Sequence, residues 1–124
     1  MDKFQAIASF WESFGIPAYD ENTVPTGDNR PSFPYITYDA SVSNLGYPVA
    51  MSGSIWYYGT SWAMITAKMT EIQSEIGMGG KIIPCDGGAL WIKQGSPFAQ
   101  RMSDPNDMVR RILINIEAEF LTAS

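Results

Sequence analysis

The sequence contains no histidine among its 124 residues. Histidine is the usual general base near neutral pH, the commonest transition-metal ligand, and the activating partner in Ser-His and Cys-His pairs. Its absence disfavours the enzyme classes that depend on these arrangements without excluding them. Enzymes without histidine exist, so a small ligand-binding or enzymatic α+β domain stays open as an alternative.

Cysteine and long apolar runs are also scarce. A single cysteine, Cys85, excludes an internal disulfide framework, and without histidine to activate it we interpret it as a structural thiol. No run approaches the ~20 apolar residues that span a bilayer. The first residues, MDKFQAIASFW, are too few and too polar for a signal peptide. We expect a soluble protein, made in a reducing cytoplasm, with no membrane partner.

Charged residues make up only 17% of the chain, below the usual ~25%. The eight basic residues do not cluster beyond Arg110-Arg111, and the net charge is −5. Sequence-independent binding of nucleic acid requires a basic patch, so we do not expect it.

Aromatic residues, by contrast, are abundant, with four Trp, six Tyr and six Phe. Such residues are enriched both in cores and at contacts with other chains. The sequence leaves both interpretations open.

The clearest pattern lies near the C-terminus, in MVRRILINIEAEF (residues 108–120). Apolar and polar residues alternate with a period of two, which predicts a long strand with one apolar face. The apolar face carries Ile112, Ile114, Ile116, Ala118 and Phe120. The polar face carries Arg111, Asn115, Glu117 and Glu119.

Two segments have the three-and-four spacing of amphipathic helices. The first spans residues 3–14, with a capping box from Asp2 and Gln5 and an end at Gly15 and Pro17. The second follows Gly59, is expected to be capped by Thr60 or Ser61, and ends at Gly77. The predicted apolar stripes are Phe4, Ile7, Ala8, Trp11 and Phe14 in the first helix, and Trp62, Ile65, Met69, Ile72 and Ile76 in the second.

The remaining segments predict strands. Residues 35–40 and 49–58 form an antiparallel pair, and residues 81–85 and 89–94 form a hairpin around Asp86-Gly87-Gly88. Gly95-Ser96-Pro97 is expected to turn the chain before a short strand at 98–102, and Asp104-Pro105-Asn106 to turn it into the last strand. The predicted fold is one α+β domain over residues 1–124, with a mainly antiparallel, or mixed, sheet and two helices packed on one face.

Residues 16–34 form a long irregular segment rich in proline and small polar residues. Loops beyond ~12–15 residues are uncommon within compact domains and are often functional or ordered by a partner. A surface excursion without a role is the alternative interpretation.

Several motifs predict no chemistry. Gly79-Gly80-Lys81 lacks the glycine spacing and the Ser or Thr of a phosphate-binding loop. The aromatic run 55–59 lacks the interleaved basic residues of an RNA-binding sheet. No acidic group has the spacing of a calcium loop, and we interpret Glu117 and Glu119 as a solvated or interface face. The acidic groups are Asp20-Glu21, Asp28, Asp104 with Asp107, and Glu117 with Glu119.

Three stretches carry a family resemblance: PYITYDA after the proline-rich segment, the strand-plus-helix pattern VAMSGSIWYYGTSWAMITAKMTEIQSEIG, and the closing MVRRILINIEAEF. In this order they resemble the tail terminator (tail completion) proteins of long-tailed bacteriophages. The resemblance runs over nearly the whole chain, although its motifs are soft patterns rather than a catalytic signature.

The resemblance implies a structural virion protein in the tail or neck, assembled in the bacterial host cytoplasm without enzymatic activity or cofactor. Such proteins form a ring, commonly a hexamer, at the head-proximal end of the tail tube. The ring stops tube polymerisation and offers a surface to the head-tail connector or neck protein. The implied partners are copies of itself, the tail tube protein and that connector, with DNA only passing through the channel.

Within this picture, residues 19–33 and 41–48 are predicted to reach neighbouring subunits or partners, and the polar face of the last strand is predicted to face the ring channel. The interface candidates are Tyr19, Asp20, Glu21, Asn29, Arg30, Asn44, Leu45, Tyr47, Trp56 and Tyr58. The channel candidates are Glu117 and Glu119. Another phage neck protein, such as a head-completion or adaptor protein, and a dimeric interaction module remain alternatives.

Overall fold

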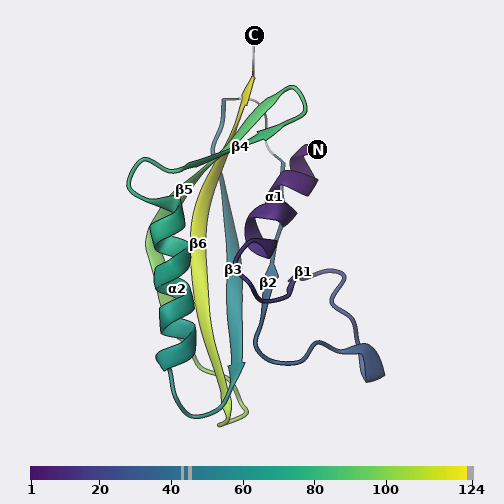
Figure 1. Cartoon of the computed structure of the whole chain (residues 1–124), viewed down its shortest axis with the longest axis vertical. Helices are drawn as coiled ribbons and strands as arrows, with labels where there is room; N and C mark the ends of the chain where they lie inside the picture. Colours follow the sequence, from purple (N-terminus) through teal and green to yellow (C-terminus); the bar gives the residue numbers. More distant parts are fainter. Residues whose placement is uncertain (43, 45, 123–124) are drawn as a thin grey trace.

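The structure of the chain is a computed structural model that describes residues 1–42, 44 and 46–122. Six strands form one sheet and two α-helices accompany it, together with the short 3₁₀ helix η1 (Gly27–Asn29) (Figure 1). The helices are α1 (Lys3–Glu12) and α2 (Ala63–Ile76). The strands are β1 (Ala18–Asp20), β2 (Tyr35–Tyr38), β3 (Val49–Tyr58), β4 (Lys81–Cys85), β5 (Gly88–Met102) and β6 (Val109–Thr122).

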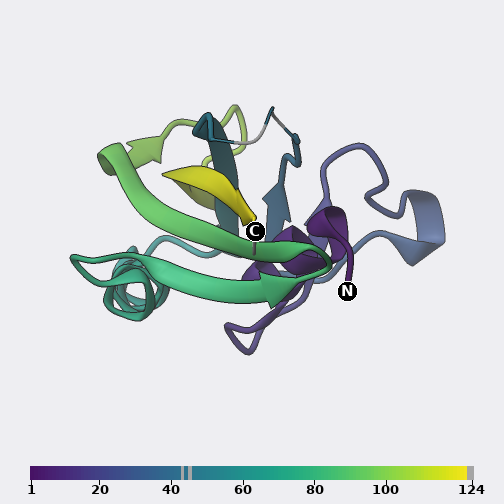
Figure 2. The ribbon, with the colours of Figure 1, turned by 90° about the horizontal axis from the view of Figure 1, so that it is seen from above.

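The strands lie in the order β1-β2-β3-β6-β5-β4. The β1–β2 pair is parallel and the other four pairs are antiparallel, which confirms the predicted α+β fold with a mainly antiparallel, mixed sheet. The sheet is curled, and both helices lie on the same side of it (Figure 2). Helix α2 packs on β3, β5 and β6, whereas α1 contacts β1, β4 and β5. Helix α1 therefore covers the opening between the two ends of the curled sheet.

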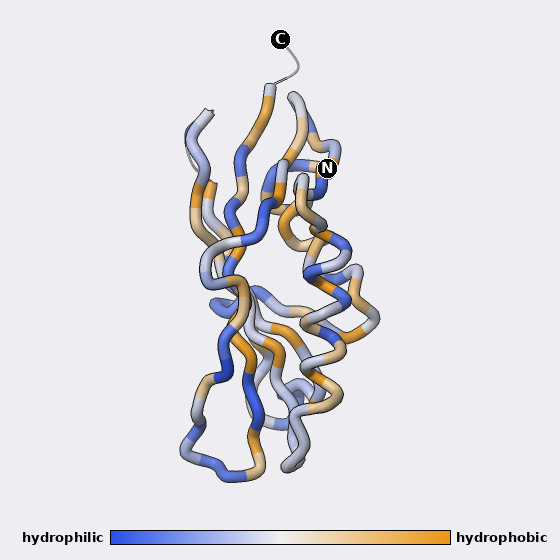
Figure 3. The backbone as a smooth tube through the Cα atoms, turned by 90° about the vertical axis from the view of Figure 1, so that its left-hand side faces the viewer, coloured by the Kyte–Doolittle hydropathy of each residue, from blue (hydrophilic) through white to orange (hydrophobic). Residues whose placement is uncertain are grey.

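Strand β6 is central, because it pairs with β3 on one side and with β5 on the other. The predicted alternation is confirmed, and apolar and polar positions alternate along the tube in Figure 3. All five predicted apolar residues are at most 3% exposed and face the helices, namely Ile112, Ile114, Ile116, Ala118 and Phe120. The opposite face of the sheet is covered by neither helix, and we call it the uncovered face.

Helix α1 begins with the predicted capping box, in which the Asp2 carboxylate accepts from the Gln5 amide at 2.8 Å and the Gln5 side chain accepts from the Asp2 amide at 2.8 Å. The helix ends at Glu12, two residues before the predicted end. The prediction of a buried Phe4 was wrong, since its side chain is 55% exposed, whereas Phe10 is buried. Phe4 lies on the Trp11 side of the helix but in its first turn, where it is exposed, while the buried face extends from Trp11 towards Phe10 and Ala6.

Helix α2 follows the predicted stripe, with Ile65, Ile72 and Ile76 buried. The predicted cap is confirmed in part, because Ser61 serves the first helical amide but does not occupy the N-cap position. The N-cap position is Trp62, which makes no side-chain cap hydrogen bond, and the Ser61 hydroxyl accepts from the Ala63 amide at 3.1 Å instead. The Trp62 ring instead makes a cation–π contact with the Arg101 guanidinium, which lies 4.6 Å from the ring centre.

The predicted turn at Gly95-Ser96-Pro97 was also wrong, because these residues lie inside one long strand, β5. The pairing with β6 shifts between Gln94 and Ala99, so β5 advances five residues where β6 advances two. The extra residues form a bulge rather than a turn. The Asn115 side chain stabilises it by donating to the Pro97 carbonyl at 2.9 Å.

The segment predicted to be irregular contains an additional strand. β1 pairs in parallel with β2, and this short ladder is closed by the amides of Ile36 and Glu21, which donate to the carbonyls of Pro17 and Tyr38 at 2.8 Å each. The antiparallel β2–β3 pair is confirmed, although β2 ends at Tyr38. The prediction missed β1 because three residues are too few to show a period.

The Tyr38 hydroxyl provides a test of this core. Burial raises its pKa above the ordinary 10.0, and the charges of Glu12 and Asp20 raise it further. The unfolded chain therefore loses this proton at a lower pH than the folded chain. The contribution of Tyr38 to the unfolding free energy is expected to stay constant below pH ~10 and to fall as the pH rises above it. Tyr38→Phe is expected to reduce this alkaline loss, whereas Tyr47→Phe, at a 64% exposed position, is expected to leave it unchanged.

Urea denaturation near neutral pH and above pH ~10 measures the effect. Part of the alkaline loss should remain in Tyr38→Phe, because burial also raises the pKa of Tyr35. The same alkaline loss in both variants and the wild type would contradict the expectation.

Candidate functional site

One end of the uncovered face carries an aromatic cluster built from four segments of the chain. The Tyr35 and Trp56 rings, paired across β2 and β3, stack at 6.2 Å between centres. Phe33 lies 5.2 Å from Tyr35 and 5.7 Å from Tyr58, and Tyr19 of β1 lies 6.3 Å from Tyr35. We call these five residues the aromatic cluster. Phe33 and Tyr58 are 38% and 52% exposed, so the cluster presents apolar surface at one end of β3.

Polar contacts fix the centre of this cluster. The Trp56 indole donates to the Thr37 hydroxyl at 2.9 Å, and the Arg111 guanidinium lies 4.8 Å from the Trp56 ring centre. Arg111 also donates to the Ser54 hydroxyl at 2.9 Å. A cation on an aromatic face stabilises the pair by about 0.5–1 kcal/mol or more. The rings are thus held in place before any partner arrives, which lowers the entropic cost of docking.

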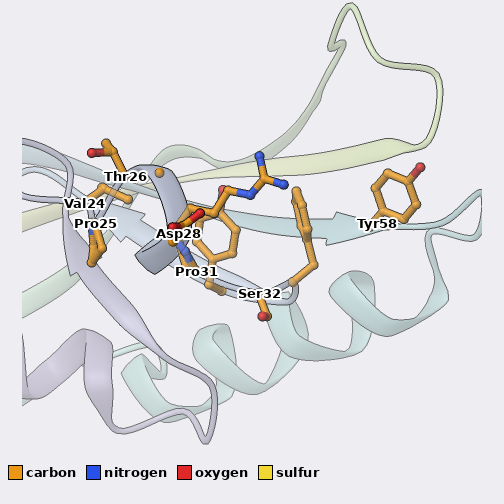
Figure 4. A pocket seen from close by; sticks show the side chains of 11 residues that line it. Val24, Pro25, Thr26, Asp28, Pro31, Ser32 and Tyr58 are labelled. Atoms are coloured by element: carbon orange, nitrogen blue, oxygen red, sulfur yellow. The ribbon is translucent and has the colours of Figure 1, made fainter.

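A groove of about 890 Å³ lies between this cluster and the segment that carries η1. Figure 4 shows the side chains of Val24 and Pro25 on one side of it and Tyr58 on the other. The charged residues that line it are Arg30 and Asp28. They are not an ion pair, and no hydrogen bond of the Arg30 side chain occurs within the described residues.

The structure gathers part of the predicted interface set. Tyr19, Trp56 and Tyr58 belong to the aromatic cluster, and Arg30 lines the groove. Nearby, Glu21 and Asn29 are exposed, and the Asp20 carboxylate accepts from the Asn22 amide at 2.8 Å.

The other predicted interface residues lie elsewhere. Asn44 and Tyr47 are exposed in the β2–β3 connection, at the end of β3 far from Tyr58. Leu45 lies outside the described residues. Sequence reasoning missed Phe33 and Tyr35 as members of the cluster. Tyr35 was assigned to a strand and Phe33 to the segment before it. The stacking of Tyr35 on Trp56 follows only from the register of β2 with β3, and the ring contacts of Phe33 follow only from the fold.

The two channel candidates lie together on the uncovered face of β6, towards the end far from the aromatic cluster. Lys93 pairs with Glu117 across the β5–β6 ladder, and its ammonium is 3.7 Å from the Glu119 carboxylate. Lys93 also lies 4.3 Å from the Trp91 ring centre. One cation therefore accompanies two carboxylates, which leaves a net negative charge at this place.

We searched the described residues for side chains that could bind a metal ion or act as a nucleophile. Within residues 1–42, 44 and 46–122, no group of three or more Cys, Asp or Glu residues is arranged to hold a metal ion. Cys85 is half-buried in β4, and Lys81 forms an ion pair with Glu75. No helix in the described part of the chain is long and apolar enough to cross a membrane.

The comparisons with known proteins bear on the fold. No family model matches the chain, and no curated protein matches it. Among solved structures, it is similar to a chain of a "Virion of native gene transfer agent (GTA) particle". The two share 17% of their residues with a TM-score of 0.62, over 96% of this chain and 94% of the other. At this identity the likeness shows a shared fold.

Proposed function

We propose that this chain is a structural protein of a phage-like virion and that it acts as a tail terminator. In this proposal six copies form a ring at the head-proximal end of the tail tube, stop its polymerisation and present a surface to the head-tail connector. The observation that carries the proposal is the fold shared, nearly end to end, with a chain of a virion particle. The resemblance of PYITYDA and MVRRILINIEAEF to tail terminators supports the finer assignment.

A ring joins each subunit to the next through two different surfaces, and closes only if the rotation between neighbours is correct. The groove beside η1 and the preorganised aromatic cluster supply one such surface. Of the predicted interface residues, Tyr19, Trp56, Tyr58 and Arg30 belong to it. Asn44 and Tyr47, at the other end of the sheet, are proposed to face the tail tube or the connector.

The proposed partners follow from this place in the virion. They are copies of the chain, the tail tube protein and the connector or neck protein, while DNA passes through the ring without specific binding. The residual negative charge at Glu117 and Glu119 is proposed to face the channel. There it would repel the phosphate backbone and keep passing DNA from adhering.

Reversing both channel charges tests this placement. Glu117→Lys with Glu119→Lys would leave three neighbouring cations at this place, the two new ones and Lys93. We therefore expect slower or arrested DNA ejection from particles that assemble normally. The matched control is Glu12→Lys with Asp107→Lys, at two exposed positions that form no ion pair within the described residues. Fluorescence of a DNA-binding dye during ejection measures the rate. Normal ejection from assembled particles that carry the β6 variant would contradict the channel assignment.

Native mass spectrometry, before and after addition of the tail tube protein, tests the function itself. We expect a ring near six times 13.7 kDa, or a monomer that becomes a ring on tubes. A stable monomer or dimer that ignores tubes would contradict the proposal. A ring that ignores tubes but binds a portal or head-completion protein would favour another neck protein.

A further inference from the structure

Trp62, which immediately precedes α2, lies beside two arginines. The Arg101 guanidinium is 4.6 Å from the ring centre and the Arg110 guanidinium is 5.6 Å from it. Two clefts open here, one of about 390 Å³ lined in part by Trp62 and Arg110, and one of about 200 Å³ lined in part by Arg101. We call Trp62, Arg101 and Arg110 the arginine surface. Trp and Arg are enriched among the residues that dominate the energy of protein contacts.

The arginines of this surface keep donors that their own subunit does not use. Among the described residues, every ion pair takes its cation from a lysine or from the N-terminal amine, and none from an arginine. Arg110 donates to the backbone carbonyls of Thr60 and Asp107, whereas exposed Arg101 makes no hydrogen bond in the described part of the chain. A guanidinium is a fork of N–H donors that fits a carboxylate. Both arginines can therefore bind carboxylates of another chain.

This end of the sheet is positive even after its own carboxylates are counted. Residues 99–112 carry three arginines, the third being Arg111, against Asp104 and Asp107. Asp104 is half-buried and accepts from the Asn106 amide at 2.9 Å. The start of α2 adds about half a positive charge, and no acidic residue in its first turn offsets it. The arginine surface therefore attracts an acidic partner.

The opposite charge gathers in residues 20–28, which we call the acidic segment. It carries the carboxylates of Asp20, Glu21 and Asp28, and the chain has no Lys or Arg from position 4 to position 29. Glu21 and Asp28 are exposed, and none of the three forms an ion pair within the described residues. With Arg30 included, three carboxylates stand against one cation, which leaves residues 20–30 with a net charge of −2.

The two regions lie on opposite sides of the molecule at similar heights. In Figure 1, α2 begins at the lower left, and η1, within the acidic segment, lies at the lower right. Figure 2, seen from above, also places α2 and η1 on opposite sides. A rotation about an axis parallel to the longest one therefore brings the acidic segment of one copy to the arginine surface of the next. Such a rotation closes a ring, whereas an added shift along the axis would produce a helix.

We infer that the acidic segment of one subunit docks on the arginine surface of a second copy of this chain. The contact is heterologous, so each subunit gives one acidic segment and receives one. The inference rests on the proposed function, since it names the second surface that the proposed ring requires, opposite the side that carries η1 and its groove.

Charge reversal on each side, followed by mixing, tests the contact. The first variant is Glu21→Lys with Asp28→Lys, and the second is Arg101→Glu, chosen because Arg110 also holds backbone carbonyls. Each variant alone is expected to raise, by about tenfold or more, the concentration at which half the subunits are in rings. An equimolar mixture is expected to restore rings, because the reversed segment of one variant meets the reversed surface of the other. Native mass spectrometry should then find equal numbers of the two variants in each ring.

Controls separate this contact from a loss of folding. Glu12→Lys reverses an exposed charge that forms no ion pair within the described residues and lies outside the acidic segment, and it should leave ring formation unchanged. Thermal unfolding of each monomeric variant should stay close to that of the wild type, because the three substituted positions are exposed. High salt should weaken the wild-type rings, since the contact depends on charge.

The outcomes separate the inference from the proposed function. Rings that form as in the wild type from either variant alone would overturn the inference and leave the proposed function standing. Loss of rings in both variants that mixing does not restore would do the same. A wild-type chain that stays monomeric at every concentration and on tubes would overturn both.

Discussion

Replacing Trp11 with alanine is expected to remove about 3–5 kcal/mol of the unfolding free energy, a large share of the 5–15 kcal/mol typical of a domain. The side chain is fully buried, stacks on Tyr38 at 6.1 Å between ring centres and meets Phe10 edge-to-face at 5.0 Å. It also fills the space that Gly53 leaves in β3, where a Cβ would lie 2.7 Å from the indole ring. Its loss leaves a cavity that the sheet cannot close.

Urea denaturation of the isolated chain measures this effect. The matched control is Phe4→Ala on the same helix, whose 55% exposed ring is expected to contribute within about ±0.5 kcal/mol. Trp11→Phe is expected to cost less than Trp11→Ala, since the indole N–H has no partner among the described residues. Equal losses in Trp11→Ala and Phe4→Ala would contradict the packing of α1 on the sheet.

Replacing Gly95 with valine is expected to cost about 3 kcal/mol or more, at the upper end of the usual range for overpacking. A Cβ at this position would lie 2.8 Å from the backbone carbon and oxygen of Asn115. Unlike a flexible side chain, the paired backbone of β6 cannot move aside without breaking the ladder. The bulge would be lost, and with it the pairing between the two longest strands.

The same chemical denaturation measures this loss, with Gly79→Ala as a control at a glycine whose Cβ would be in open space. Gly79→Ala should leave the monomer as stable as the wild type. A Gly95→Val chain of wild-type stability would show that β5 does not follow β6 as described.

The contrast between Gly95 and the last strand shows what the sequence could predict. β6 was predicted closely because it is buried on one face along its length, so burial imposes its period on the residues. The bulge was misread as a turn because Gly-Ser-Pro chemistry is common to both. Only the register with β6 decides between them, and this register is set by residues far along the chain, such as Ile114 and Ile116.

The aromatic cluster was also predicted only in part. Trp56 and Tyr58 were predicted from the aromatic run 55–59, and Tyr19 from the long irregular segment 19–33, and the sheet brings them together. Tyr35 was missed because its stacking on Trp56 depends on the pairing of β2 with β3. Phe33 was missed because it precedes β2, and its ring contacts depend on where that pairing places Tyr35 and Tyr58.

As a tail terminator, this protein is proposed to form a ring that caps a growing tail tube. The most direct test of this proposal is the length of tubes polymerised from the cognate tail tube protein, measured by electron microscopy with and without this chain. We expect tubes that stop growing once a ring of this protein sits at one end, at a ratio of one ring per tube. Tubes that continue to lengthen with the chain in excess, and carry no added density at either end, would contradict the account.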